Sequence, residues 1–545
     1  MSFRRTGPRP SLLAFLGFVA AIAFIFLASS LGGPDLPVAS ATAGYPTLPA
    51  DLRSLLPGGA EASTEPGGQA TPAIGAIAIV PVTSFRNPWA STSAAEVANV
   101  VAGRSSRYAA VEVTQDEAAL VLQAIAVPTS AAGSRVIVAS DAATLRADLA
   151  AHPDRLGFLA SSDVDPSVRA LGWDGLTLFG VQRVATLDGW PLTIAPPPGT
   201  VPATATPYDP ATAWTLVAVG DINLDGGVAY HVKQLHLGVN FPFDGGTATI
   251  TGRTCCSAVG LPLPIARRTG NGGAVRDLLS LSDLSLADFE SPAPNRFTYH
   301  PAGLTFTADP ALIEGLSNAG IDWVSLANNH IGDAGGQGIL DTLQNLDTWG
   351  IAHGGAEASL DAARSATLLD AGGITVGILG YDTIRPASAA GPDRPGTNEM
   401  SATRVQEDVA AARAAGAQLV VVFAHWGTEY TAQTTARQRA LAHAAIDAGA
   451  DIVIGSHTHW AGGVEIYRGK PILYSLGDFV FDVQRSEQTE EGIIVEATYE
   501  GTTLVQLQLV PYVVLDGSQP NLLDPAGRGK VVLRQVFGAS PDLPW

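Results

Sequence analysis

The sequence predicts an α/β fold divided into more than one domain, and three observations support this. Short apolar runs such as Ile452–Ile454 and Ile472–Leu476 have the length and the glycine-bounded ends of buried strands. Stretches with helical spacing, such as Arg437–Ala448, alternate with these runs, and this alternation is typical of α/β proteins. The chain has 545 residues, which exceeds one ordinary domain, so we expect two or three.

Composition and charge exclude several classes of protein. Charged residues make up 15% of the chain, while glycine (59) and proline (37) are plentiful, as expected of a globular protein with polar linkers. The net charge of −20 argues against nucleic acid as a partner, because phosphate backbones require a basic surface. An anionic substrate would therefore need local help from a metal ion or a helix N-terminus.

The two cysteines of the chain, Cys255 and Cys256, are adjacent in sequence. They can form neither a disulfide framework nor a thiolate zinc site, so burial of a core must hold the fold. We expect two unpaired thiols in a loop, and a strained vicinal disulfide is the alternative.

The N-terminal residues 1–33 predict a membrane anchor. Three arginines lie within the first nine residues and precede the uncharged run Leu12–Leu31, whose helical length of about 30 Å would cross a bilayer. The basic flank should remain in the cytoplasm, so we expect a single-pass protein of the cell membrane with extracytoplasmic C-terminal domains. A cleaved signal peptide is the alternative, but the small residues of Ala39–Ala43 lie far beyond the apolar run.

Two linkers divide the rest of the chain. Residues 34–72 are rich in Pro, Ala, Gly, Ser and Thr without an apolar period, which predicts a disordered spacer. Residues 73–196 alternate apolar and helical stretches and predict a smaller α/β lobe. Residues 197–212 form a second linker, rich in Pro and Thr, and residues 213–545 follow as the larger domain.

Two segments of the smaller lobe, Ile79–Tyr108 and Arg155–Gly175, loosely resemble the phosphate-type periplasmic solute-binding proteins. The resemblance covers about one lobe, whereas such proteins clamp their ligand between two. This lobe has three alternative roles: a spacer, a docking surface, or a phosphate- or solute-sensing module.

Polar side chains follow strand ends repeatedly in the larger domain. Asp221 ends an apolar run that begins at Trp214, and its alternative role is to cap the next turn. Asp288 and Glu290 follow another short strand. Their side chains have the same parity, so one can bind a metal while the other orients it.

Three further strand ends carry nitrogen and amide ligands. The run Trp323–Ala327 leads into Asn328, Asn329 and His330, and an apolar run from Val420 leads into His425. An Asn oxygen suits a hard divalent ion, and a neighbouring His can protonate a leaving oxygen without being a ligand. An Asx turn beside a surface histidine is the alternative. The turn after Ile452–Ile454 adds a histidine pair: His457 and His459.

These candidates offer nitrogen and oxygen atoms and no thiolate, which favours Mn, Fe, Zn or Mg. Seven candidates are too many for one tetrahedral ion and suit two divalent ions about 4 Å apart, which would activate a bridging water. The seven are Asp221, Glu290, Asn329, His330, His425, His457 and His459.

Six motifs follow one another along the larger domain: VGDINLD, ADFESP, SLANNHIGDAGGQGI, FAHWGTEY, GSHTH and ILYSLGDFVFD. Their order resembles that in CapA-type capsule and poly-γ-glutamate biosynthesis proteins, which are similar to a branch of the calcineurin-like metallophosphoesterases. The resemblance covers about Trp214–Val514 and implies a four-layer αββα domain with metals at the strand ends. It implies His330 as the general acid. The metal ligands that the resemblance implies are Asp221, Glu290, Asn329, His425, His457 and His459.

The chain departs from the family pattern at several positions. The family has Asn-Leu-Glu where Asp288, Phe289 and Glu290 stand, Pro where Thr458 stands, and Asn where Asp478 stands. The GSHTH motif is closer to the wider phosphoesterase pattern. This departure affects the substrate that the resemblance implies, and it leaves the implied metal ligands in place.

We therefore expect an exported, membrane-anchored, metal-dependent hydrolase of phosphoester type in capsule or poly-γ-glutamate biosynthesis. Its partners would be an anionic polymer or phosphoester substrate, the membrane, and membrane proteins of capsule synthesis, with no nucleic acid and no organic cofactor. A non-enzymatic component that binds an anionic polymer during export is the alternative, and a solute-sensing module is another.

Overall fold

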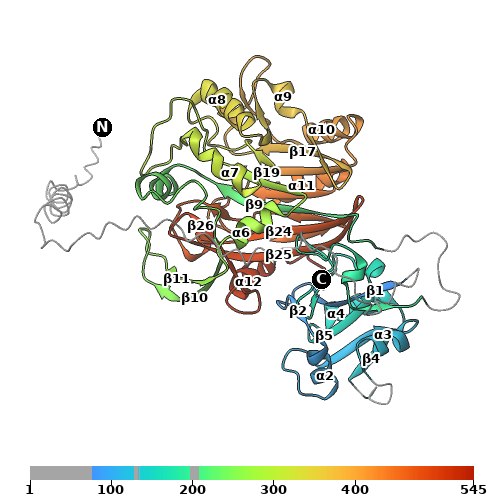
Figure 1. Ribbon diagram of the computed structural model, residues 1–545. Helices are drawn as coiled ribbons and strands as arrows, with labels where there is room; N and C mark the ends of the chain where they lie inside the picture. Colours follow the sequence, from blue (N-terminus) through green and yellow to red (C-terminus); the bar gives the residue numbers. More distant parts are fainter. Residues whose placement is uncertain (1–75, 128–132, 134, 197–207, 545) are drawn as a thin grey trace, which may run out of the picture. The chain divides into compact units, whose positions relative to one another are not determined.

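The computed structural model of the protein describes most of the chain after the first linker (Figure 1). The predicted anchor Leu12–Leu31, the spacer 34–72 and most of the second linker lie outside the described residues. No helix in the described part is long and apolar enough to cross a membrane. The described residues are 76–127, 133, 135–196 and 208–544.

The predicted smaller lobe is an α/β unit built on a mixed sheet of order β4-β3-β5-β1-β6, with β8 also paired to β1. Strand β3 is parallel to β4 and β5, whereas β1 is antiparallel to β5 and β6. Two of its helices begin at capping side chains, because Ser93 accepts from the Glu96 amide and Asp141 from the Thr144 amide. The bounds are β1 Ile77–Ser84, β2 Ser91–Thr92, α2 Ala94–Val101, β3 Ala110–Thr114, α3 Ala118–Ala124, β4 Val136–Ala139, α4 Ala142–Ala151, β5 Arg155–Ala160, β6 Val168–Ala170, β7 Gly172–Trp173 and β8 Thr193–Ile194.

The larger domain contains a ten-stranded sheet, in which β9 (Ala213–Ile222) occupies a central place between β24 and β12. Strands β12 and β23 run parallel to β9, and β24 runs antiparallel to it. The other bounds are β10 Thr247–Thr254, β11 Leu263–Gly270, β12 Leu284–Phe289, β13 Trp323–Ser325, β14 Ala352–Gly354, β23 Asp478–Val480, β24 Glu491–Glu500, β25 Thr503–Leu515 and β26 Gln519–Leu523.

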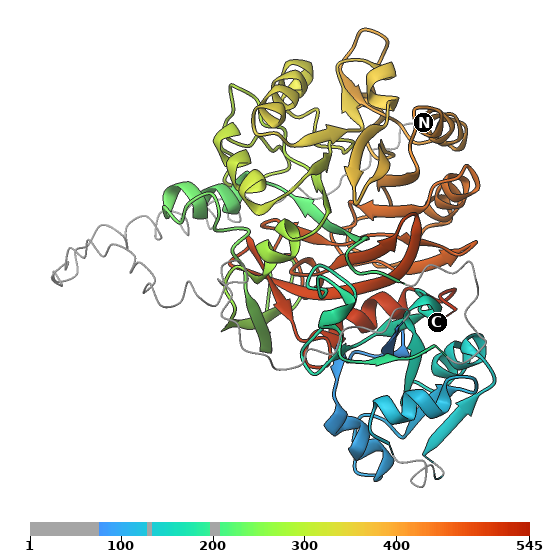
Figure 2. The same ribbon diagram turned by 45° about the vertical axis from the view of Figure 1, so that its right-hand side comes forward.

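A second sheet of six strands has the order β16-β17-β19-β20-β22-β21, and Figures 1 and 2 show it beside the first sheet. Strands β17, β19, β20 and β22 are parallel, so their carboxyl ends meet at one edge. The predicted strand Ile452–Ile454 is confirmed within β20. The bounds are β16 Thr367–Ala371, β17 Ile374–Asp382, β19 Leu419–His425, β20 Ile452–Ser456, β21 Val464–Tyr467 and β22 Lys470–Leu473.

Three buried apolar clusters hold the larger domain together. One cluster joins both sheets and includes Leu216 of β9 and Ile454 of β20. Another packs α6, α7 and α8 against the first sheet, and a third packs α10 and α11 against the second. The bounds of the helices are α5 Gly226–Ala229, α6 Ala274–Ser280, α7 Ile313–Ala319, α8 Gly335–Thr348, α9 Leu360–Arg364, α10 Ala402–Ala414, α11 Ala436–Asp447 and α12 Lys530–Gly538.

The expectation of two unpaired thiols is wrong, because Cys255 and Cys256 form a vicinal disulfide. They follow directly after β10, which ends at Thr254, in the connection to β11. Adjacent side chains point to opposite faces within a strand, but in this connection the two sulfur atoms can meet. The sequence alone could not distinguish the two states.

Substitution of Trp214 tests the packing contact between β9 and β24. Its ring is fully buried and stacks on Tyr499 with centroids 4.6 Å apart, and its Nε1 donates to the Gly501 carbonyl at 2.8 Å. We expect Trp214→Ala to lower the free energy of unfolding by about 3–5 kcal/mol in chemical denaturation, because it leaves a cavity. The control Trp349→Ala removes a ring that is 37% exposed and should cost much less. Equal losses in the two variants would contradict this packing.

Candidate metal centre

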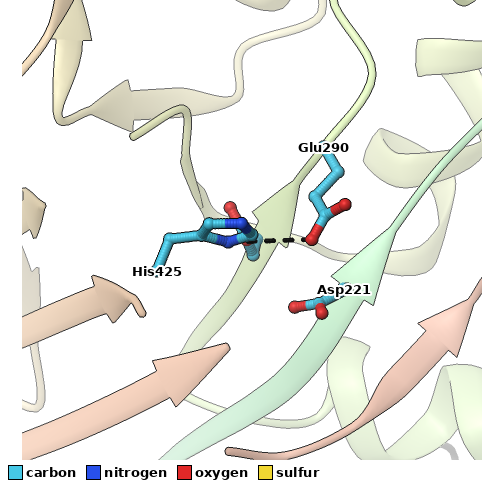
Figure 3. Close-up of side chains that lie close together, drawn as sticks. Asp221, Glu290 and His425 are labelled. Carbon is cyan, nitrogen blue, oxygen red and sulfur yellow. Dashed lines mark hydrogen bonds and ion pairs between the residues drawn. The ribbon is translucent and has the colours of Figure 1, made fainter. Parts of the chain in front are cut away.

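The predicted site residues stand at the carboxyl ends of strands from both sheets. Asp221 lies near the end of β9, Glu290 directly follows β12, and His425 ends β19. Figure 3 shows these three side chains converging, with Glu290 Oε1 3.6 Å from His425 Nδ1. All three residues are buried. The pairing of parallel strands therefore brings together groups that are far apart in the sequence.

Glycine at position 220 fixes the position of Asp221. The Asp221 amide donates to the Gly477 carbonyl at 3.1 Å, and a Cβ at Gly220 would lie only 1.7 Å from that oxygen. Any other residue would force β9 away from the loop before β23. The close approach places Asp221 opposite Asp478 in the register of β9 and β23.

Several polar atoms in this cluster are buried without a hydrogen-bond partner in the part of the chain that the structure describes. They include one oxygen each of Asp221 (Oδ1), Glu290 (Oε1) and Asp478 (Oδ2). An unpaired buried carboxylate is costly, by several kcal/mol as a rule, unless a cation or a proton neutralises it. The oxygen atoms thus fit the ligand sphere of a divalent ion.

Electrostatics in the cluster follow from burial and from the neighbouring charges. Burial, followed by repulsion from nearby carboxylates, raises the pKa of Asp221 and of Glu290 well above the usual range. Burial also raises the pKa of Asp288 to about 7 and lowers that of His425. The lowered pKa keeps the His425 imidazole neutral, which is the form that binds a metal, whereas the carboxyl groups need a nearby cation to stay ionised.

Two groups of potential ligand atoms share Asp221. The first contains Asp221, Asp288, Glu290 and His425, and the second contains Asp221 and Asp478 together with His459. Within each group the ligand atoms lie within 4.8 Å of one another. One carboxylate common to two groups is the arrangement expected of a bridging ligand.

The remaining predicted ligands contact His425. Its Nε2 lies 2.6 Å from Asn329 Oδ1 and 3.0 Å from His457 Nδ1. The His457 amide also donates to Asp221 Oδ2 at 3.1 Å. The structure therefore brings all six predicted ligands into one cluster.

The backbone of the GSHTH loop is unusual at both histidines. His457 has φ +86° and His459 has φ +59°, in the left-handed region that residues with a side chain rarely adopt. Tyr430 shares this property with φ +60°, and its amide donates to the Thr458 carbonyl at 2.8 Å. Such conformations cost about 1–3 kcal/mol each and cluster at functional sites. The two loops hold each other in place.

His330, the predicted general acid, lies beside the cluster and is paired with Asp333. Its Nδ1 is 2.8 Å from Asp333 Oδ2, and its side chain is 14% exposed. Asp333 also pairs with Arg385 at 2.8 Å. Burial alone would raise the pKa of Asp333, but the contacts with His330 and Arg385 bring it below the usual range. Because Nδ1 is engaged, Nε2 is the nitrogen available to a substrate.

Sequence reasoning missed three residues of the site, Asn223, Asp333 and Asp478, as functional candidates or partners. It did name Asp288, as one of two carboxylates of which one binds a metal and the other orients it. Asp288 contacts His425 Nδ1 at 2.6 Å, and Asp478 contacts His459 Nδ1 at 2.7 Å. The signal for Asn223 was its position two residues after Asp221, which gives it the same side-chain parity. Asn223 is fully buried, and its Nδ2 has no partner among the described residues. Asp333 follows His330 in a turn without a strand pattern.

Comparisons with known proteins find a family and relatives that are similar to this domain. The family model described as "Bacterial capsule synthesis protein PGA_cap" matches residues 215–483. "Capsule biosynthesis protein CapA" of Bacillus anthracis is 29% identical, and the match covers 50% of this chain and 68% of the relative. "PGA biosynthesis protein CapA" of Bacillus subtilis is also 29% identical, and the match covers 48% of this chain and 70% of the relative. The solved structure of calcineurin-like phosphoesterase YfkN from Bacillus subtilis is 12% identical with a TM-score of 0.33, covering 59% of this chain and 97% of that one.

The matched residues contain both histidines of the GSHTH loop and every other predicted ligand. The domain that carries the site thus belongs to the family of bacterial capsule synthesis proteins of the CapA type.

Proposed function

We propose that the protein is a metal-dependent hydrolase of phosphoester type that acts in capsule or poly-γ-glutamate biosynthesis. The observation that carries the proposal is the buried cluster in which Asp221 belongs to two groups of ligand atoms. The printed roles of the Bacillus relatives support the biological setting. The four-layer αββα order of the domain is part of the proposal, supported by the apolar clusters within and outside the two sheets.

Two divalent ions, of Mn, Fe, Zn or Mg, are proposed for the cluster. Asp221, Glu290, Asn329 and the histidines at 425, 457 and 459 would hold them, with Asp478 as a further candidate. When bound, such ions lower the pKa of a water molecule and neutralise charge on a phosphoryl group.

The chain's own residues then supply orientation and a proton. Asp333 holds the His330 ring through Nδ1, so Nε2 can donate a proton to a leaving oxygen. Phe306 packs against the same ring, with centroids 4.3 Å apart, and its amide donates to Asp333. This packing and hydrogen bonding restrict the His330 ring to one orientation.

Attachment to the cell membrane through Leu12–Leu31, with the folded domains extracytoplasmic, remains a proposal. It is supported by the basic flank and the length of the apolar run in the sequence. Membrane fractionation with and without residues 1–33 tests it, because removal should release the protein from the membrane fraction.

Asp288→Asn tests the ligand sphere. Asp288 holds His425 through Nδ1 and also accepts from Ser456 Oγ at 3.0 Å. We expect the substitution to lower metal affinity about 10–100-fold, because outer carboxylates orient the ligand imidazoles. Metal content by elemental analysis and a chelator-competition titration measure the effect. Asp347→Asn, at a side chain that is 74% exposed, is the matched control. A wild-type chain without bound metal would reject the proposal.

His330→Ala separates the enzyme from a non-catalytic polymer-binding protein. We expect turnover of a generic phosphodiester to fall about 10²–10⁴-fold while metal content is retained, because a general acid is lost and no ligand is removed. His152→Ala, on the surface of the smaller lobe, should leave turnover unchanged. If wild type binds metal and an anionic polymer but shows no turnover, the alternative function is correct.

A further inference from the structure

A cavity of about 240 Å³ lies beside the proposed metal centre. Trp426, Gly427 and Thr428, which follow His425 in the chain, line part of it. Thr383 and Ile384 line another part, and the Thr383 amide donates to the His425 carbonyl at 3.0 Å. The cavity therefore begins one residue from a predicted metal ligand.

The rest of the cavity wall comes from the start of α11. Its first turns contribute Arg437, Gln438 and Leu441, preceded by Thr435. Thr435 and Gln438 form a capping box, so this end of the helix is rigid. Gly427 packs closely here, because a Cβ at that position would lie 2.6 Å from Gln438 Nε2 and 3.0 Å from the Thr458 methyl carbon. The cavity thus also borders the loop that carries His457 and His459.

The chemistry of the lining favours a negative group. Arg437 is exposed and lines the cavity, and within the described residues it has no ion pair. The hydroxyl-bearing residues Thr383 and Thr428 also line the cavity, and none of the lining residues has a carboxylate side chain. The chain carries a net charge of −20, so a cavity with an arginine and no acid is a local exception. Glu429, the exposed acidic neighbour in this loop, does not line the cavity.

Two more guanidinium groups stand near the cluster. Arg385 follows Ile384 and donates from Nη1 to the Asn329 carbonyl at 3.0 Å, next to His330. Arg485 lies over the Tyr430 ring at 4.2 Å, and Tyr430 in turn stacks on His459 with centroids 5.4 Å apart. Positive side chains therefore occur both on the His330 side and on the His459 side of the cluster.

We propose that the cavity at Arg437 binds a second negative group of the substrate, next to the group held at the metal centre. The substrate would then be a chain with anionic groups on successive units, rather than a small molecule with one charged group. This inference rests on the proposed function, since the metal centre holds the first group. Carboxylate and phosphate chains share the required chemistry, and the arms of the experiment distinguish them.

The experiment compares trimers with monomers by calorimetric binding to the full, metal-loaded chain. The probes are γ-linked triglutamate against glutamate, and a glycerol phosphate trimer against glycerol phosphate, the latter pair in a His330→Ala background to prevent turnover. We expect Arg437→Gln to weaken trimer binding about tenfold, because it removes a charge-assisted hydrogen bond, and to leave the monomers unchanged. If the Arg437→Gln substitution weakens the binding of only one of the two trimers, that trimer shows whether the anionic groups of the substrate are carboxylates or phosphates.

Arg468→Gln is the matched control, because it removes the same charge from an exposed turn outside the cavity lining. Equal binding of both trimers by wild type and the Arg437 variant would overturn the inference, as would an equal loss for monomers and trimers or an equal loss in the Arg468 variant. The experiment measures binding rather than turnover, so the two proposals can fail separately. If the protein binds metal and trimers but does not hydrolyse them, the proposed hydrolase function is wrong and the proposed role of the cavity is still supported.

Discussion

Repulsion between carboxylates buried at the ends of β9, β12 and β23 constrains the whole site. Burial is the largest cause that raises the pKa of Asp221, and the charges of Asp288 and Asp478 add to it. Burial also raises the pKa of Glu290, and there the charges of Asp221, Asp288 and Asp478 add to it. The strands cannot relax this repulsion, because Asp221 is tied to the Gly477 carbonyl and β9 pairs on both sides. Added positive charge is what allows the carboxylates to stay together in ionised form. The arrangement of donors therefore points to metal ions more directly than the fold does.

Three histidines of the site follow one pattern. His330, His425 and His459 each direct Nδ1 to a carboxylate, at 2.8, 2.6 and 2.7 Å. In each case the pairing fixes the ring and leaves Nε2 for the function, which is a known role of carboxylates around metal-binding histidines. The same device thus serves a proposed proton donor and two proposed ligands.

The sequence predicted the strand ends well, and the reason is physical. Parallel strands buried on both faces read as apolar runs, so the polar residues that end them, such as Asp221 and His425, stand out. Partners that come from other segments gave no such signal. Asp333 pairs with His330 across a turn, and the pairing of Asp478 with His459 depends on the approach of β23 to β9. The state of Cys255 and Cys256 depends on a local conformation that residue types do not specify.

Strand β24 affects where the chain can be cut to express the part that carries the candidate metal centre. The family match ends at residue 483, but Glu491–Glu500 and the two strands after it complete the sheet on one side of β9. A fragment cut at the family boundary would leave that side of β9 as an open edge with apolar side chains such as Leu216, and such edges promote aggregation. A soluble fragment should therefore extend at least through Leu523, where β26 ends.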